Sequence, residues 1–154
     1  MKKTTTPDNA RNKDQQNIIK DFLDRGEDPF SPENIVKIHD GKGVYNKIIY
    51  ENNEWYVIKN LWPLVNSKDH FVVICKRPIK TITQMNNKEV TALFEAQSWT
   101  IKTHAIKGGA FCMRFGNPKI SGTTCTRLHG HILSPQKSTT LEFYVGQFKN
   151  RLNK

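Results

Sequence analysis

The sequence predicts a single α+β domain with a mainly antiparallel sheet of about five strands. Short segments rich in β-branched and aromatic residues recur along the chain, with turn-forming residues between them. One long segment, residues 87–107, has apolar residues at helical spacing. The length of 154 residues suits one hydrophobic core. Hairpin strands, one helix and then further strands are typical of the α+β class.

The N-terminal region is expected to be a polar arm followed by a short helix. Residues 1–14 are polar, and we expect them to be disordered. An amphipathic helix is expected over residues 17–25, with Gly26 at its end. We therefore divide the chain into an N-terminal arm, residues 1–30, and a folded domain, residues 31–154.

The folded domain is expected to contain six candidate strands and one long helix. The strands are expected at residues 44–50, 55–59, 70–76, 110–115, 128–133 and 141–146. The third of them is apolar throughout its centre, which favours burial on both faces. Asn86 or Asn87 can cap the start of the helix, which extends to about Lys107 before Gly108 ends it.

The charge of the chain is concentrated in its folded part. Lys and Arg number 24 against 14 Asp and Glu, a formal net charge of +10. Residues 1–32 carry equal numbers of basic and acidic side chains, so the excess belongs to residues 33–154. A basic domain indicates an anionic partner, either nucleic acid or a small phosphorylated ligand. Solubility alone remains the alternative explanation.

Membrane and secretory classes are disfavoured by the sequence. No apolar run approaches the roughly 18–20 residues that span a bilayer. The basic start of the chain is not followed by the apolar stretch of a secretory signal. Cys75, Cys112 and Cys125 match neither a disulfide framework nor a metal-binding pair. We therefore expect a reduced, cytoplasmic protein.

The segment from Gly122 to Pro135 is the most informative for function. Side chains alternate between the faces of a strand, so Arg127, His129 and His131 are expected on one face, about 6–7 Å apart. Three basic groups in this arrangement favour a phosphate site. Two satisfied polar histidines on a solvent-facing strand are the alternative.

Five stretches together resemble the histidine-triad (HIT) superfamily of nucleotide hydrolases and transferases. That superfamily carries the signature His-φ-His-φ-His-φ-φ, where φ is apolar. The corresponding stretches here are Asn60-Leu61-Trp62-Pro63, the strand beginning at Asp69-His70, the helix over residues 87–107, Gly122-Thr123-Thr124, and Arg127-Leu128-His129-Gly130-His131-Ile132-Leu133. The resemblance covers residues 48–135. It implies that the partner is a small nucleotide, that this chain forms a homodimer, as many members do, and that no cofactor or metal ion is required.

The resemblance also implies catalytic roles. His129 matches the nucleophile, which attacks the α-phosphorus and forms a nucleotidyl-histidine intermediate. His131 would contact the phosphate, and His70 would join the histidine network. Thr124 matches a hydroxyl group near the leaving group. Water, inorganic phosphate or another acceptor would then take the nucleotidyl group.

The remaining matched residues imply nucleotide and phosphate binding. They are Asn60, Arg114, Asn117, Gly122, Thr123 and Arg127. Arg114 and Arg127 are expected to lower the pKa of His129 and to stabilise charge on the phosphoryl oxygens. Leu61, or one of the aromatic residues Trp55, Tyr56 and Trp62, is a candidate to flank the base, although core packing is the default for the aromatic residues.

Arg127 and Gly130 depart from the superfamily pattern. A guanidinium at position 127 binds phosphate but cannot donate a proton at neutral pH. Gly130 stands where a larger apolar residue is usual. The first departure leaves open a nucleotide-binding module with little or no catalysis.

Two further alternatives are a metal site and an enzyme that acts on nucleic-acid ends. His129 and His131 could be metal ligands, but no Asp or Glu lies between Glu95 and Glu142 to complete the site nearby. Members of the superfamily that process nucleic-acid ends usually carry an additional binding domain. A nucleic-acid partner is therefore not expected.

Overall fold

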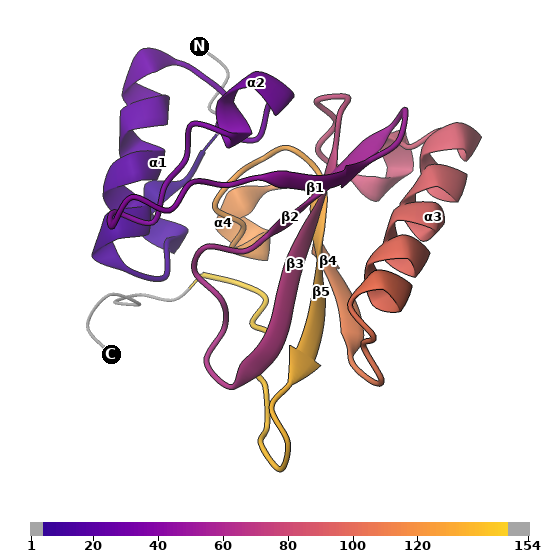
Figure 1. The fold of residues 1–154 in the computed structure, drawn as a ribbon. Helices are drawn as coiled ribbons and strands as arrows, with labels where there is room; N and C mark the ends of the chain where they lie inside the picture. Colours follow the sequence, from indigo (N-terminus) through magenta and orange to yellow (C-terminus); the bar gives the residue numbers. More distant parts are fainter. Residues whose placement is uncertain (1–4, 148–154) are drawn as a thin grey trace.

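The computed structural model describes residues 5–147 and contains one five-stranded antiparallel sheet (Figure 1). The order of the strands across the sheet is β1-β2-β3-β5-β4. They are β1 (Ile48–Glu51), β2 (Trp55–Lys59), β3 (Ser67–Cys75), β4 (Ala110–Arg114) and β5 (His129–Pro135). The α+β class and the antiparallel sheet of five strands are therefore confirmed.

Helices lie on both sides of this sheet (Figure 1). The long helix α3 (Asn87–Thr103) covers one face, and the N-terminal helices α1 (Lys13–Arg25) and α2 (Pro32–Ile35) lie on the other side. The short elements are η1 (Pro7–Asn9), η2 (Ile82–Gln84) and α4 (Pro118–Ser121).

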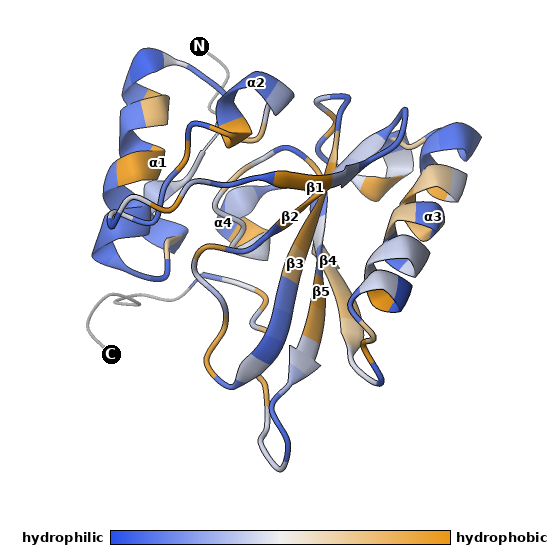
Figure 2. Cartoon of the chain, viewed as in Figure 1, coloured by the Kyte–Doolittle hydropathy of each residue, from blue (hydrophilic) through white to orange (hydrophobic). Residues whose placement is uncertain are grey.

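The core is divided into two layers by the sheet. Val57 and Val73 pack with Leu93 and Ala96 of α3, whereas Ile58 and Ile74, on neighbouring positions of the same strands, pack in the second layer. That second layer also contains Phe22 of α1, Ile35 of α2 and Ile38. Because side chains alternate between the faces, β3 is buried on both sides over residues 70–75, as its apolar sequence predicts. Figure 2 shows the hydrophobic residues concentrated in these strands and hydrophilic residues over much of α1.

Local signals set the helix ends. Asn12 caps α1 by accepting a hydrogen bond from the Gln15 amide, and Gly26 ends it in the left-handed conformation. Asn86 caps α3 and forms a capping box with Glu89. The helix ends at Thr103, four residues before the expected Lys107, because the chain already turns at Ala105, whose φ is 49°.

Three further expectations about the elements are wrong. Helix α1 begins at Lys13, four residues before the expected start. No strand forms at residues 141–146, since this segment lies beside Arg114 and gives its Tyr144 carbonyl to the Arg114 guanidinium instead of to a neighbouring strand. The expected disorder of residues 1–14 is wrong for residues 5–14, because Thr5 bridges to Cys125 and the Thr6 amide donates to the Thr124 carbonyl at 2.7 Å. Residues 1–4 lie outside the described part of the chain.

Candidate active site

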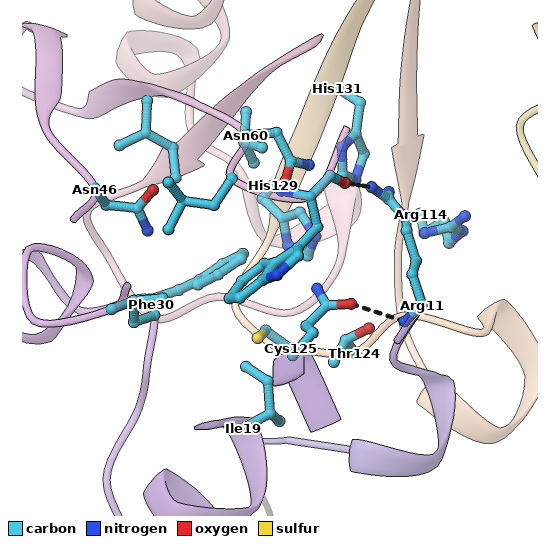
Figure 3. A pocket seen from close by; sticks show the side chains of 16 residues that line it. Arg11, Ile19, Phe30, Asn46, Asn60, Arg114, Thr124, Cys125, His129 and His131 are labelled. Carbon is cyan, nitrogen blue, oxygen red and sulfur yellow. Dashed lines mark hydrogen bonds between the residues drawn. The ribbon is translucent and has the colours of Figure 1, made fainter. Parts of the chain in front are cut away.

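A cavity lies between the sheet and the N-terminal segment, and it brings five of the predicted site residues together (Figure 3). These are Asn60, Arg114, Thr124, His129 and His131. Leu61 and Trp62, both candidates for flanking a base, also line it, whereas Trp55 and Tyr56 are buried in the core. The cavity volume is about 50 Å³.

Strand pairing positions the histidines. His129 and His131 are alternate residues of β5, so they share a face, and their ring centroids are 5.3 Å apart. The neighbouring strand β3 contributes His70, whose Nε2 lies 2.9 Å from Nδ1 of His131. The network that includes His70 is thus present, although His70 itself lies beside the cavity and not in its lining.

Both ring nitrogens of His70 have hydrogen-bond partners. The Leu64 amide donates to Nδ1 at 3.0 Å. Nε2 faces Nδ1 of His131, and the tautomers of the two rings decide which nitrogen donates. Nε2 of His131 is buried and has no hydrogen-bond partner within residues 5–147. Asn60 lies beside this network, with Nδ2 at 3.0 Å from His70 Nε2.

The ring of His129 is held with one nitrogen available for chemistry. Nδ1 lies 2.7 Å from the Arg127 carbonyl oxygen, so Nδ1 is the protonated nitrogen and Nε2 keeps its lone pair. Phe30 packs edge-on against the ring at a centroid distance of 4.8 Å. These contacts orient a neutral imidazole, which is the form that acts as a nucleophile.

All three imidazoles are neutral near pH 7. Burial and, to a smaller extent, the charges of Arg11 and Arg114 together lower the pKa of His70 to about 3. The pKa of His129 is lowered to about 4, mainly by burial and also by the charges of Arg114 and Arg11, against the opposing effects of its hydrogen bond to the Arg127 carbonyl and of Asp28. The pKa of His131 is well below its usual value, mainly through burial. Arg114 thus has the expected effect on His129, but the second cation is Arg11 and not Arg127.

The cavity has a cationic side and an apolar side. Figure 3 shows Arg11 and Arg114 on the side of His131, and Asn46 and Phe30 on the opposite side. Arg114 is buried, donates to the Tyr144 carbonyl at 2.8 Å and lies over the Phe143 ring at 4.1 Å. The apolar side also includes Ile38, Ile58 and Val72. The Oδ1 atom of Asn46 is buried and lacks a hydrogen-bond partner among the described residues.

Arg127 is not part of the cavity lining, contrary to the expected shared face with the histidines. Strand β5 starts at His129, so the alternation that places His129 and His131 on one face does not reach Arg127. Its guanidinium pairs with Asp28 at 2.8 Å and donates to the carbonyls of Cys75 and Lys76. A buried guanidinium with these partners serves to attach the N-terminal segment to the sheet.

Asn117, Gly122 and Thr123 are also outside the cavity. Asn117 caps α4, and the Gly122 amide donates to the Pro118 carbonyl at 3.0 Å, so that amide is already used within the turn. Thr123 donates its hydroxyl to the Cys125 carbonyl. Of this loop, Thr124 reaches the cavity, and its hydroxyl donates to the Asn9 carbonyl at 3.3 Å.

Sequence reasoning missed the contribution of the N-terminal region. Arg11, Gln15, Ile19 and Phe30 line the cavity, although the region was expected to be an arm and a helix of unknown role. The amphipathic pattern of α1 indicated that one side must pack on something. Nothing in the local sequence indicated that Arg11 would reach the histidines.

Other chemistry is not supported by the described side chains. Within residues 5–147, no group of three or more His, Cys, Asp and Glu side chains is arranged to hold a metal ion. Cys125 lines the cavity, but burial raises the pKa of its thiol well above the usual value, so it stays protonated. None of the described helices has the length and apolar character to cross a membrane.

Several solved structures with a similar fold are named as histidine-triad proteins. "Hit Like Protein" matches with a TM-score of 0.52 and 21% identity, over 63% of this chain and 93% of its own. The HIT family hydrolase from Clostridium thermocellum matches with a TM-score of 0.50 and 21% identity, over 65% and 88%. A histidine triad protein from Clostridium difficile matches with a TM-score of 0.51 and 19% identity, over 67% and 90%. At these identities the likeness concerns the fold. The comparison with curated proteins gave no match.

The fold and the histidine motif therefore define a protein of the HIT superfamily. Within it, the chain belongs to the family described as "Scavenger mRNA decapping enzyme C-term binding", whose model matches residues 34–143. The matched range is more than half of the chain and leaves out the whole N-terminal segment that lines the cavity.

Proposed function

We propose that this chain is a HIT-type nucleotide hydrolase or nucleotidyltransferase that acts at an α-phosphate through His129. The observation that carries the proposal is the neutral ring of His129. Its Nδ1 is bonded to a backbone carbonyl, while Nε2 keeps its lone pair beside a cavity that contains two arginines. The names of the structural relatives agree with this class, since one is a HIT family hydrolase.

The polarity of the cavity orients the nucleotide. The base would lie on the side of Phe30, Ile38 and Trp62, where Asn46 offers an unpartnered amide oxygen to an exocyclic amine. The phosphates would lie on the side of Arg11 and Arg114, which attract negative charge. This orientation places the α-phosphate, between base and leaving group, next to His129 and His131.

The cavity must enlarge for a nucleotide to enter. Its volume is about 50 Å³, whereas small-molecule sites usually occupy roughly 300–1,000 Å³. The turn around Trp62 is a suitable element to move, since it is half-buried and the adjacent Val65 is 83% exposed. Binding would therefore proceed through displacement of this turn from its position over the cavity.

The test is to trap the covalent intermediate. The protein is incubated with a dinucleoside polyphosphate labelled at the α-phosphate, quenched, and analysed for labelled protein. We expect label on the wild-type chain and none on His129→Ala, with turnover reduced on the order of 10³-fold or more. His104→Ala, an exposed histidine at the end of α3, is the control and should retain both label and turnover.

The same experiment separates catalysis from binding alone. If wild-type protein binds the nucleotide but neither forms labelled protein nor turns it over, the chain is a nucleotide-binding module. That alternative follows from Arg127, because a guanidinium held by Asp28 cannot donate a proton to a leaving group. Label that persists in His129→Ala would contradict the assignment of the nucleophile.

We also propose that the protein functions in a reducing compartment such as the cytoplasm. Cys75, Cys112 and Cys125 are free, and burial raises the pKa of each thiol. Protonated, separated thiols have no structural need for an oxidising environment.

A further inference from the structure

A second and larger hollow lies on the face of the sheet that carries the histidines. Cys112 of β4 pairs with His131 of β5, so the two side chains share a face. The neighbouring Phe111 and Met113 pack on the opposite side, with the core beneath α3. Beyond His131 on the histidine face lies a groove with a volume of about 850 Å³. None of the residues that line this groove lines the histidine cavity, so the two sites are separate.

Three lysines lie at the outer end of this groove, which we therefore call the lysine groove. Figure 1 shows the start of β3, the start of β4 and the end of β5 at the same end of the sheet. Lys68 is at the start of β3, Lys107 precedes β4 and Lys137 follows β5, and all three line the groove. They are exposed, and none of them forms an ion pair with another residue in the described range 5–147. Because no lining residue is Asp or Glu, this end of the groove attracts anions.

The inner end of the lysine groove, toward the histidines, is apolar. Leu133 lies two positions after His131 in β5, and Leu141 and Phe143 are contributed by the C-terminal segment. Phe143 is also the boundary with the histidine cavity. Its ring centroid is 5.3 Å from that of His131 and 4.1 Å from the guanidinium carbon of Arg114. A ligand in the groove would thus have its charged part at the lysines and its apolar part near Phe143.

The C-terminal wall of the lysine groove is fixed at both ends. The Asn66 side chain donates to the Thr140 carbonyl at 3.0 Å, and the Asn66 carbonyl accepts from the Gln136 amide at 2.8 Å. After Phe143, the Tyr144 carbonyl accepts from Arg114 at 2.8 Å. The groove is therefore preformed between this segment and the sheet, as ligand sites usually are.

The chemistry of the lysine groove favours a small phosphorylated molecule over a macromolecule. The groove lies on a face of the sheet, whereas the backbone hydrogen-bonding groups of β4 lie in its plane, so a peptide cannot pair there as an added strand. Phe143 is the one aromatic side chain among the lining residues, which suits one ring, whereas a single-stranded nucleic acid stacks several bases. Ammonium groups act as point charges that suit phosphates. The volume also lies within the range of roughly 300–1,000 Å³ that is usual for small-molecule sites.

We propose that the lysine groove is a second ligand site, which binds a small molecule with two or more phosphate charges joined to an apolar ring. The phosphates lie among Lys68, Lys107 and Lys137, and the ring contacts Leu141 and Phe143. This site is independent of the reaction proposed at His129, because it holds its ligand with a different set of residues.

Cys112 provides a reporter for occupancy of the lysine groove. It lines the groove and is half-buried, whereas Cys75 and Cys125 are 0% and 2% exposed, so N-ethylmaleimide should modify Cys112 first. Its rate of modification is measured by peptide mass spectrometry with adenosine triphosphate, inorganic triphosphate or adenosine as probes. We expect saturating adenosine triphosphate to slow the modification about 5-fold or more. Inorganic triphosphate should need a roughly 10-fold higher concentration because it lacks the ring, and adenosine should not protect.

Matched variants show whether the lysines and not the histidines hold the probe. Lys107→Gln combined with Lys137→Gln should raise the concentration for half-protection roughly 10-fold or more. Lys20→Gln combined with Lys88→Gln removes the same charge from exposed positions of α1 and α3 and should leave it unchanged. His129→Ala should also retain the protection. Equal rates without probe in all variants would show that the groove itself is intact.

Several results would overturn this second site. They are an absence of protection by adenosine triphosphate up to about 5 mM, equal protection in the Lys107/Lys137 variant, or loss of protection in His129→Ala. An oligonucleotide or an acidic peptide that protects Cys112 at concentrations at least about 10-fold lower than adenosine triphosphate would assign the groove to a macromolecule instead. Protection in a wild-type protein that forms no labelled intermediate would leave the second site in place and contradict only the catalytic role of His129.

Discussion

The buried imidazoles of His70, His129 and His131 link the chemistry of the site to the stability of the chain. Each is at most 5% exposed, and protonation of any of them would place a charge next to two arginines. The same burial that keeps His129 neutral therefore makes the folded protein sensitive to acid.

We expect stability to fall as the pH decreases from about 6.5 to 4. The pKa of His129 is about 4 in the folded chain, below its ordinary value of 6.5, so the unfolded chain binds protons first and stability present above pH 6.5 is lost as the pH falls. The lowering of the His129 pKa from 6.5 to about 4 alone corresponds to about 3 kcal/mol in the free energy of unfolding. Urea denaturation at a series of pH values measures it.

A variant identifies the residue responsible for this pH dependence. His129→Gln should have a shallower dependence than wild type between pH 6.5 and 4, whereas His39→Gln, at a half-buried histidine away from the cavity, should follow wild type. Identical profiles for His129→Gln and wild type would contradict the low pKa of His129.

Gly130, between His129 and His131, is required by its neighbour on β4. A Cβ atom at this position would lie 2.2 Å from Cζ of Phe111, whose ring occupies the space that a side chain at position 130 would need. The absence of a side chain at 130 and the large side chain at 111 are thus complementary.

We expect Gly130→Val to destabilise the fold by about 1–3 kcal/mol, because the added methyl groups overlap the Phe111 ring. Urea denaturation gives the free energy of unfolding. In a Phe111→Ala background the same substitution should be less destabilising, and equal effects in the two backgrounds would show that the two positions are not coupled.

Among the secondary-structure elements, the turn that follows α1 connects the N-terminal segment to the histidine strand. Asp28 of this turn pairs with Arg127, whose side chain is 7% exposed, just before β5 begins. The Phe30 carbonyl accepts from the Tyr56 hydroxyl of β2, and the Phe30 ring contacts His129. Arg127 is therefore paired with a carboxylate from outside the matched region.

Asp28→Ala should destabilise the protein by about 2–4 kcal/mol, because it leaves the Arg127 guanidinium buried without its counter-charge. Asp21→Ala removes one partner of an exposed ion pair with Arg25 and should change the free energy of unfolding by less than about 0.5 kcal/mol. Chemical denaturation compares the two variants. Equal stability of both would mean that the Asp28–Arg127 pair does not hold the N-terminal segment.

At the scale of the whole molecule, one sheet edge and one helix surface are exposed. Within residues 5–147, strand β4 is at the end of the sheet and pairs with β5 alone. On α3, Val90, Phe94 and Ile101 are 41%, 64% and 41% exposed. We propose that these surfaces form the interface of a homodimer.

Multi-angle light scattering should give a mass of twice 17.8 kDa for the wild type. Phe94→Asp places a charge in the apolar surface and should shift the mass to that of the monomer, whereas Lys88→Asp, at an exposed polar position of the same helix, should not. A monomeric wild type at about 100 µM, a concentration well above the Kd of a stable dimer, would contradict the homodimer.

Local patterns in the chain were sufficient for the fold class and for the position of most strands and of the long helix. Alternation in residues 70–75 and 129–133 and helical spacing after Asn86 depend on neighbouring residues, so they predicted the buried strands, the long helix and the shared face of His129 and His131. The motifs of the superfamily resemblance also pointed to Asn60, Arg114 and Thr124, which line the cavity.

Contacts between distant parts of the chain decided the rest. Asp28 and Arg127 are 99 positions apart, Asn9 and Thr123 are 114 apart, and Arg11 and Trp62 are 51 apart. No spacing rule relates such residues, because their proximity arises only when α1 packs its apolar side against the cavity face of the sheet. That packing gave Arg127 a carboxylate partner and placed Arg11, instead of Arg127, in the cavity lining. It also buried the histidine rings, so that they remain neutral.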